Sequence, residues 1–209
     1  MTGPRPEASP ERAAQALAES AKTQVRIAGF GGQGIVLAGK ILGQAAAIHE
    51  GANAVMTQSY GPEARGGACS ADVIASAARI HYPRVTRPDI LVLMSEEAAR
   101  TYGPKAAEDA TVLVNEDLVK TVPEGAGLRV FKIPATKIAE SLGRRIMANI
   151  VMLGFVSAVT GVVSREAMRE AVLQNIPPGT EKMNLAAFDA GCEHGSAEAG
   201  PGQPEEEDA

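Results

Sequence analysis

Two glycine-rich segments, about thirty residues apart, hold the residues of this chain that are best suited to binding a ligand or a partner. The first, Gly29-Phe-Gly-Gly-Gln-Gly34, follows an apolar run and precedes a helical pattern. Its spacing matches G-x-G-x-x-G, in which the backbone turns tightly and leaves free N–H groups at the start of a helix. The candidate contact residues of this segment are Gly29, Gly31, Gly32, Gln33 and Gly34.

A dinucleotide site would also need an acidic residue at the end of the second strand, to bind ribose hydroxyls. The stretch that should form that strand ends Val55-Met-Thr-Gln58, with neither Asp nor Glu and no Arg for a 2′-phosphate. Lys40 lies too far along the chain for a Walker phosphate loop. The glycines therefore fit two other interpretations better: a structural turn that packs the helix against the sheet, and a contact surface.

The second segment concentrates glycine, proline, an aromatic ring and two opposite charges. Tyr60 offers an amphipathic ring and Arg65 a planar fork for a carboxylate or phosphate, although Arg65 could also pair with Glu63 in a solvent-screened turn. The composition is typical of contact surfaces, and we expect the segment to emerge at the same sheet edge as the first. Its candidate residues are Ser59, Tyr60, Gly61, Pro62, Glu63, Arg65, Gly66 and Gly67.

Other chemistry has little support in the sequence. Cys69 and Cys192 form no C-x-x-C pattern and are too few for an iron–sulfur cluster. The three histidines lack metal-ligand spacing, and no serine has a visible His and Asp partner set. We therefore predict no catalytic residue, no metal site and no cofactor bound by this chain alone.

Charge and composition predict a neutral body with an acidic end. The net charge of the 209 residues is -5, and residues 197–209 contain five acidic residues without any Lys or Arg. A neutral body without a basic stripe argues against nucleic acid as a partner. No apolar run reaches the ~18 residues of a membrane span, and a signal-peptide pattern is missing, so we expect a cytoplasmic protein.

Hydrophobic periodicity predicts strands that alternate with helices, and so a three-layer α/β/α sandwich of Rossmann-like type. The sheet should be mostly parallel, with an antiparallel hairpin between residues 69–76 and 79–82. We expect a flexible N-terminal extension at 1–23, one domain at 24–194 and an acidic disordered tail at 195–209. Strands are predicted at 24–28, 54–56, 69–76, 89–94, 111–114 and 128–133, and helices from 33, from Ser95, from 135, at 144–160, from Ser164 to 174 and at 181–192.

Several of these motifs together resemble the gamma subunit of the 2-oxoacid:ferredoxin oxidoreductases. The resemblance extends over about residues 25–192, and the second glycine segment is most similar to the 2-oxoglutarate branch. The pyruvate and 2-ketoisovalerate branches are close alternatives. The motifs are the two glycine segments, Ala71-Asp-Val-Ile74, Pro83, Pro88-Asp89 and Met94-Ser-Glu-Glu-Ala98.

This resemblance implies a non-catalytic subunit of a complex that oxidatively decarboxylates a 2-oxoacid. The complex transfers the acyl group to coenzyme A (CoA) and passes two electrons to ferredoxin. It implies thiamine diphosphate and Mg²⁺ on alpha and beta partner subunits, and [4Fe-4S] clusters on beta and a possible delta subunit. The alternatives are a free nucleotide-binding Rossmann-like module and a scaffold whose loops only pack.

Overall fold

The computed structural model describes residues 22–60, 68–125 and 127–198, and these form a six-stranded sheet. The order of the strands is β2-β3-β1-β4-β5-β6. β1, β4, β5 and β6 run parallel to one another, whereas β3 is antiparallel to both β1 and β2. The strands are β1 (Thr23–Phe30), β2 (Asn53–Tyr60), β3 (Ala68–Ser76), β4 (Ile90–Leu93), β5 (Thr111–Asn115) and β6 (Arg129–Ile133).

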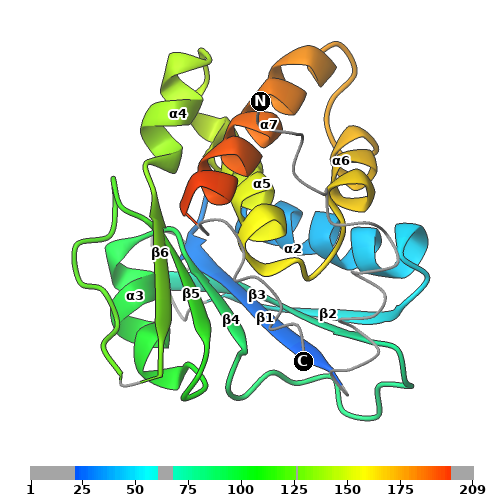
Figure 1. Cartoon of the computed structure of the whole chain (residues 1–209), viewed down its shortest axis with the longest axis vertical. Helices are drawn as coiled ribbons and strands as arrows, with labels where there is room; N and C mark the ends of the chain where they lie inside the picture. The colour runs from blue at the N-terminus through cyan, green and yellow to red at the C-terminus, as the bar shows by residue number, and fades with distance from the viewer. Residues whose placement is uncertain (1–21, 61–67, 126, 199–209) are drawn as a thin grey trace, which may run out of the picture.

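Helices cover both faces of this sheet, which confirms the three-layer fold. In Figure 1, α2, α5, α6 and α7 gather on one side of the sheet, and α5 lies centrally among them. The opposite face packs against α3, in a second and smaller apolar cluster. The helices are α2 (Ile35–Gln44, continued by a π-helical turn Ala45–His49), α3 (Glu96–Tyr102), α4 (Ala135–Ser141), α5 (Ala148–Thr160), α6 (Arg165–Leu173) and α7 (Glu181–Glu198).

The central parallel strands are buried on both faces. In β4, Val92 belongs to the larger apolar cluster under α2 and α5, while Leu91 and Leu93 belong to the cluster under α3. Such strands need no polar alternation, which explains their continuous apolar sequences. The two predicted helix caps are also confirmed. The Ser95 hydroxyl accepts a hydrogen bond from Ala98 N at 3.2 Å, and the Ser164 hydroxyl accepts one from Ala167 N at 3.1 Å.

The predicted hairpin between residues 69–76 and 79–82 is wrong. Residues 79–82 form no strand, and β3 pairs instead with β1 on one side and β2 on the other. Both edges of β3 are therefore already occupied. The antiparallel contribution that we expected is real, but it comes from a β2–β3 hairpin.

Helices α5 and α7 pack unusually close together through glycine. A Cβ at Gly154 would lie 2.0 Å from the carbonyl oxygen of Phe188, and a Cβ at Gly191 would lie 1.9 Å from that of Val151. Every residue of α5 from Ala148 to Ser157 is buried, so this helix has no solvent-facing stripe.

Two helix boundaries differ from the prediction. Residues Arg145–Met147 form a short 3-10 turn before α5, which leaves Ile146 56% exposed instead of on a buried face. Helix α7 continues to Glu198 instead of ending at Cys192, because Gly195 is buried against Phe155 and Ala158. Residues 195–198 are thus helical, not part of a tail. Within the described ranges, no helix is long and apolar enough to cross a membrane.

Candidate functional site: a cleft at the carboxyl edge of the sheet

The first glycine segment is a tight turn that a glutamine holds in place. Gly29 is the penultimate residue of β1, and the turn follows. The Gln33 side chain accepts a hydrogen bond from Phe30 N at 2.9 Å and donates one to Met94 O at 2.8 Å, so it connects the ends of β1 and β4. A Cβ at Gly29 would lie 2.3 Å from Gln33 Oε1, so a larger residue there would displace the Gln33 side chain.

The last glycine of this segment joins α2 to α5. Gly34 caps α2 with φ 73°, a left-handed conformation that favours glycine. Its carbonyl accepts a hydrogen bond from Asn149 Nδ2 at 3.3 Å, and a Cβ at Gly34 would lie 2.4 Å from that same nitrogen. The start of α2 is therefore fixed against the start of α5.

The strands that lead into the two glycine segments end at the same edge of the sheet. Gly29 in β1 and Tyr60 in β2 are both paired with Cys69 in β3, which begins between them. Ser59 and Tyr60 are thus the last residues of β2, not loop residues. The other candidates, Gly61, Pro62, Glu63, Arg65, Gly66 and Gly67, lie outside the described residues.

This topology also separates the first turn from any dinucleotide geometry. In a dinucleotide fold, the acidic residue ends a parallel strand beside β1. Here the neighbour on that side is β3, which is antiparallel and places its first residues beside Gly29. The parallel strand β2 lies one position further away.

A cleft of about 570 Å³ opens beside the glycine turn. The turn, the first residues of α2, the start of α5 and the start of α7 form its walls. Most of its lining is apolar, and we call it the carboxyl-edge cleft. Its apolar residues include Phe30, Ile35, Leu37, Ile146, Met147, Ile150, Ile176 and Met183, and its polar side chains include Arg144, Asn149, Thr180 and Asn184.

The electrostatic character of the carboxyl-edge cleft favours a negative group. The amino end of α2 faces the cleft through Ile35 and Val36, and the first N–H groups of a helix carry partial positive charge. Arg144 adds an exposed guanidinium, and among the described residues that line the cleft there is no Asp or Glu. On the far wall, Asn184 Nδ2 donates to both the carbonyl and the hydroxyl oxygen of Thr180 at 3.0 Å, which fixes the entry into α7.

A second hollow of about 290 Å³ continues from the cleft across the ends of β1 and β4. The two share Phe30, Gly32 and Ile146, and they differ in that the hollow reaches Thr136 and Arg145. Phe30 is 38% exposed and Ile146 is 56% exposed, and both lie where the cleft and the hollow meet. An exposed apolar ridge flanked by arginines suits contact with a ligand or with another protein.

The described residues around this edge offer binding but little reactivity. Burial raises the pKa of the Cys69 thiol beside the cleft and also that of the Cys192 thiol, so both stay protonated near neutral pH. Within the described ranges, no cluster of three or more His, Cys, Asp or Glu could hold a metal ion.

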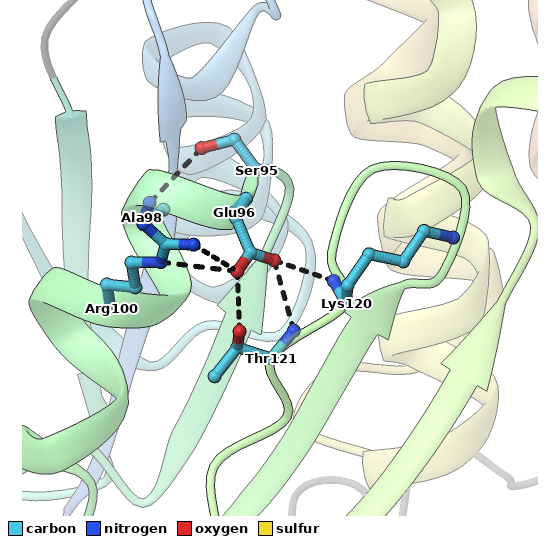
Figure 2. A network of polar contacts seen from close by, with 6 residues as sticks. All are labelled: Ser95, Glu96, Ala98, Arg100, Lys120 and Thr121. Carbon is cyan, nitrogen blue, oxygen red and sulfur yellow. Dashed lines mark hydrogen bonds and ion pairs between the residues drawn. The ribbon is translucent and has the colours of Figure 1, made fainter.

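Directly after β4, at the same edge of the sheet, the carboxylate of Glu96 forms a network of polar contacts that has a structural role. Figure 2 shows Glu96 accepting hydrogen bonds from the Thr121 hydroxyl at 2.5 Å and from the backbone nitrogens of Lys120 at 2.6 Å and Thr121 at 3.0 Å. Arg100 pairs with it at 3.2 Å. These contacts, chiefly the Thr121 hydroxyl, lower the pKa of Glu96 from its usual 4.5 to about 2. Glu96 therefore anchors the connector after β5 to α3, consistent with the predicted helix first turn.

Sequence reasoning missed the far wall of the carboxyl-edge cleft. Arg144, Asn149, Thr180 and Asn184 are more than a hundred residues from the glycine turn, and no local pattern marks them. The break at Pro177-Pro-Gly179 was the available signal, because it sets where α7 begins.

Comparison with known proteins places this architecture in a family. The family described as pyruvate ferredoxin/flavodoxin oxidoreductase matches residues 24–194. The 2-oxoglutarate synthase subunit KorC of Methanocaldococcus jannaschii is 50% identical over 175 residues, which cover 82% of this chain and 93% of that protein. The ketoisovalerate oxidoreductase subunit VorA of Methanothermobacter thermautotrophicus is 36% identical over 180 residues, covering 84% of this chain and 37% of that protein.

A solved structure supports the same family. The gamma subunit of a keto/oxoacid ferredoxin oxidoreductase from Geobacter sulfurreducens is 40% identical, with a TM-score of 0.76. The match covers 84% of this chain and 99% of the Geobacter subunit. On the sequence and the fold together, this chain belongs to the pyruvate ferredoxin/flavodoxin oxidoreductase family.

Proposed function

We propose that this chain is the gamma subunit of a 2-oxoglutarate:ferredoxin oxidoreductase, and that its carboxyl-edge cleft receives part of CoA, the acyl acceptor. The identity of 50% to a 2-oxoglutarate synthase subunit over nearly its full length supports the assignment. The cleft itself is the observation that carries the role: an apolar groove that starts at a helix amino end and has an arginine at its rim.

The redox and decarboxylation chemistry belongs to the partner subunits in this proposal. An iron–sulfur cluster needs several thiolates close together, but Cys69 lies in β3 and Cys192 in α7, and both are buried and protonated. Bound Mg²⁺ needs oxygen ligands, and the part of the cleft lining that the structure describes has no carboxylate. The clusters and Mg²⁺ therefore do not fit the described residues, and we assign them, together with thiamine diphosphate, to alpha, beta and possibly delta subunits.

The chemistry of CoA matches the cleft in two respects. The methylene and methyl groups of its long arm suit walls such as Ile150 and Met183, and its phosphates suit the amino end of α2 and Arg144. The corner at Thr180 and Asn184 is already hydrogen-bonded, so binding needs little reorganisation there. The chain would orient the acceptor while other subunits supply the acyl group.

The exposed parts of the same edge would meet the partner subunits. Phe30 and Ile146 form the apolar ridge, and Tyr60, Glu63 and Arg65 belong to the segment that begins at the end of β2. Ferredoxin would be reached only through the assembled complex.

The test is reconstitution of the complex from co-expressed subunits. We expect CoA-dependent reduction of a viologen by 2-oxoglutarate with the complex and none with this chain alone. Arg144→Ala should raise the KM for CoA about tenfold, because a hydrogen bond to a charged group contributes about 1.5–3 kcal/mol and this one is at an exposed rim. The control Arg169→Ala, on α6 away from the cleft, should leave that KM unchanged. An unchanged KM for CoA in Arg144→Ala would refute the proposal that CoA binds in the cleft.

Two alternatives have their own tests. The 36% identity to a ketoisovalerate oxidoreductase subunit favours 2-ketoisovalerate as the next candidate substrate, with pyruvate after it. Comparing kcat/KM of the complex for the three 2-oxoacids decides between them. A free nucleotide-binding module would instead bind NAD with a micromolar constant in calorimetry of the isolated chain.

A further inference from the structure

The connector between β3 and β4, residues 77–89, is ordered without being helix or strand. Its first residue, Ala77, accepts a hydrogen bond from Asn53 Nδ2 at 3.1 Å, and Asp89 N at its end donates to Gln24 O at 2.8 Å. In the middle, Val85 is buried and its carbonyl accepts a hydrogen bond from Arg26 Nη2 at 2.8 Å. The connector is thus fixed at both ends and at its centre.

A buried ion pair supports the central attachment. Arg26 in β1 donates two hydrogen bonds to Asp72 in β3, at 2.7 and 2.6 Å, and its guanidinium also stacks on the ring of Tyr102, 5.2 Å from the centroid. Both members of the pair are at least nine-tenths buried as residues. Because Arg26 is held so firmly, the carbonyl of Val85 that it binds is held with it. A preformed surface loses less conformational entropy when it binds a partner.

The connector displays one aromatic ring and several positive charges. Tyr82 is 60% exposed, and Arg79, Arg84 and Arg87 are exposed together with His81. No acidic residue occurs between Asp72 and Asp89. Arg87 is 3.5 Å from Glu108, with both side chains mostly exposed, whereas no residue in the described ranges pairs with Arg79 or Arg84.

The connector lies at the opposite edge of the sheet from the carboxyl-edge cleft. It starts where β3 ends and stops where β4 begins, and Thr23, the first residue of β1, pairs with Ala75 close to that end of β3. A contact here is therefore independent of any contact that the glycine turn makes.

We propose that the connector, residues 77–89, is a second docking surface and binds a carboxylate-rich face of another subunit of the oxidoreductase. Tyrosine and arginine are enriched among the residues that dominate protein interfaces, and unpaired arginines select an acidic partner. Nucleic acid is a poorer fit, because its binding commonly neutralises 6–10 phosphates and this surface presents three arginines. The proposal rests on the proposed function, since it requires partner subunits.

The test measures assembly of the complex with the full chain. A tagged partner subunit is immobilised, and the dissociation constant for this chain is measured between 50 and 500 mM KCl. We expect Arg79→Glu/Arg84→Glu to weaken assembly about tenfold or more at low salt and to reduce its salt dependence. Tyr82→Ala should weaken assembly about tenfold with the salt dependence kept. The charge-matched control Lys40→Glu/Lys132→Glu, exposed on α2 and β6, should stay within about twofold of the parent chain.

The outcomes separate this proposal from the one before it. If the parent chain fails to assemble with any partner subunit, the proposed function fails. If it assembles and the arginine variant assembles equally well, with the same salt dependence and an unchanged melting temperature, the docking surface is refuted. Removal of residues 199–209 also tests the chain's own acidic end as the occupant. Tighter assembly on removal, in the parent chain but not in the arginine variant, would overturn the proposal, as would arginine-dependent binding of a DNA duplex.

Discussion

Replacing Gly191 by alanine should force helices α5 and α7 apart. The new Cβ would lie 1.9 Å from the carbonyl oxygen of Val151, whereas real Cβ contacts essentially never fall below 3.0 Å. The clash is with backbone, so no side-chain rotation relieves it, and the helices must separate by roughly 1 Å at this point. Phe155 and Phe188 are fully buried in these two helices and would lose contacts.

The magnitude follows from two opposing effects. Overpacking a well-packed core typically costs 1–3 kcal/mol, and a backbone clash belongs at the upper end. Alanine in place of glycine in a helix returns up to about 1 kcal/mol. We therefore expect Gly191→Ala to lower the free energy of unfolding by about 2 kcal/mol, which corresponds to a fall in Tm of about 4–8 °C for a domain of this size.

The chain contains a matched control for the helix propensity. Gly43 lies inside α2, and the nearest atoms to a Cβ placed there are 3.9 Å away, on Met56 and Val73. Gly43→Ala should therefore raise the stability by about 1 kcal/mol. Both variants are compared by thermal unfolding and by urea titration, with far-UV circular dichroism as the check on fold.

A functional readout accompanies the stability measurement. Helix α5 brings Asn149 and Ile150 to the carboxyl-edge cleft, and α7 brings Met183 and Asn184. Separating the helices moves these walls, so Gly191→Ala in the complex should also raise the KM for CoA. If Gly191→Ala proves as stable as the parent while Gly43→Ala is stabilised, then the close helix contact contributes nothing, and this reasoning is refuted.

Three further changes have definite expected outcomes. Glu96→Gln should lower Tm at neutral pH. The pKa of Glu96 is about 2 in the folded protein, and its ordinary value is 4.5. The difference in Tm between parent and variant should therefore be largest above pH 4.5, shrink as the pH falls below 4.5, and vanish near pH 2. A Tm difference independent of pH would contradict the charged role of Glu96. Asp72→Asn should cost about 3–5 kcal/mol by urea titration, because it leaves the buried Arg26 without its counter-charge, and a loss below 1 kcal/mol would show that the pair is dispensable. Arg65→Ala should weaken assembly or turnover with Tm unchanged. Unaltered assembly and kinetics would refute the prediction that Arg65 belongs to the contact surface.

The elements that the sequence predicted well are those in which local pattern and burial agree. Strands β4 and β5 are continuous apolar runs, as central strands should be, and Ser95 and Ser164 cap helices where their types favour it. The edge strand β2 was predicted only over 54–56, although it covers Asn53–Tyr60. Thr57, Gln58 and Ser59 near its end are polar and exposed, so pairing with β3 decides their conformation and periodicity does not.

The candidate site was only half accessible to sequence reasoning. The glycine turn is local, and its spacing identified it. The Gln33 side chain lines the second hollow and also forms hydrogen bonds with Phe30 N and Met94 O, a connection between strands that no sequence pattern indicates. The opposite wall comes from α5 and α7, and its position depends on how closely those helices approach through Gly154 and Gly191. Such close packing is a tertiary property, with no periodic signal in either helix.

The β2–β3 hairpin lies at one side of the sheet, where a change in its length would leave the core in place. β3 pairs with β1, β2 pairs with β3 on its far side, and β2 ends where β3 begins, at the sheet edge that carries the glycine turn. Adding two residues to each strand would preserve the inward and outward alternation of side chains and extend the hairpin by about 7 Å. The length of the hairpin would therefore change in discrete steps, while the glycine turn and the helices behind it stay in place.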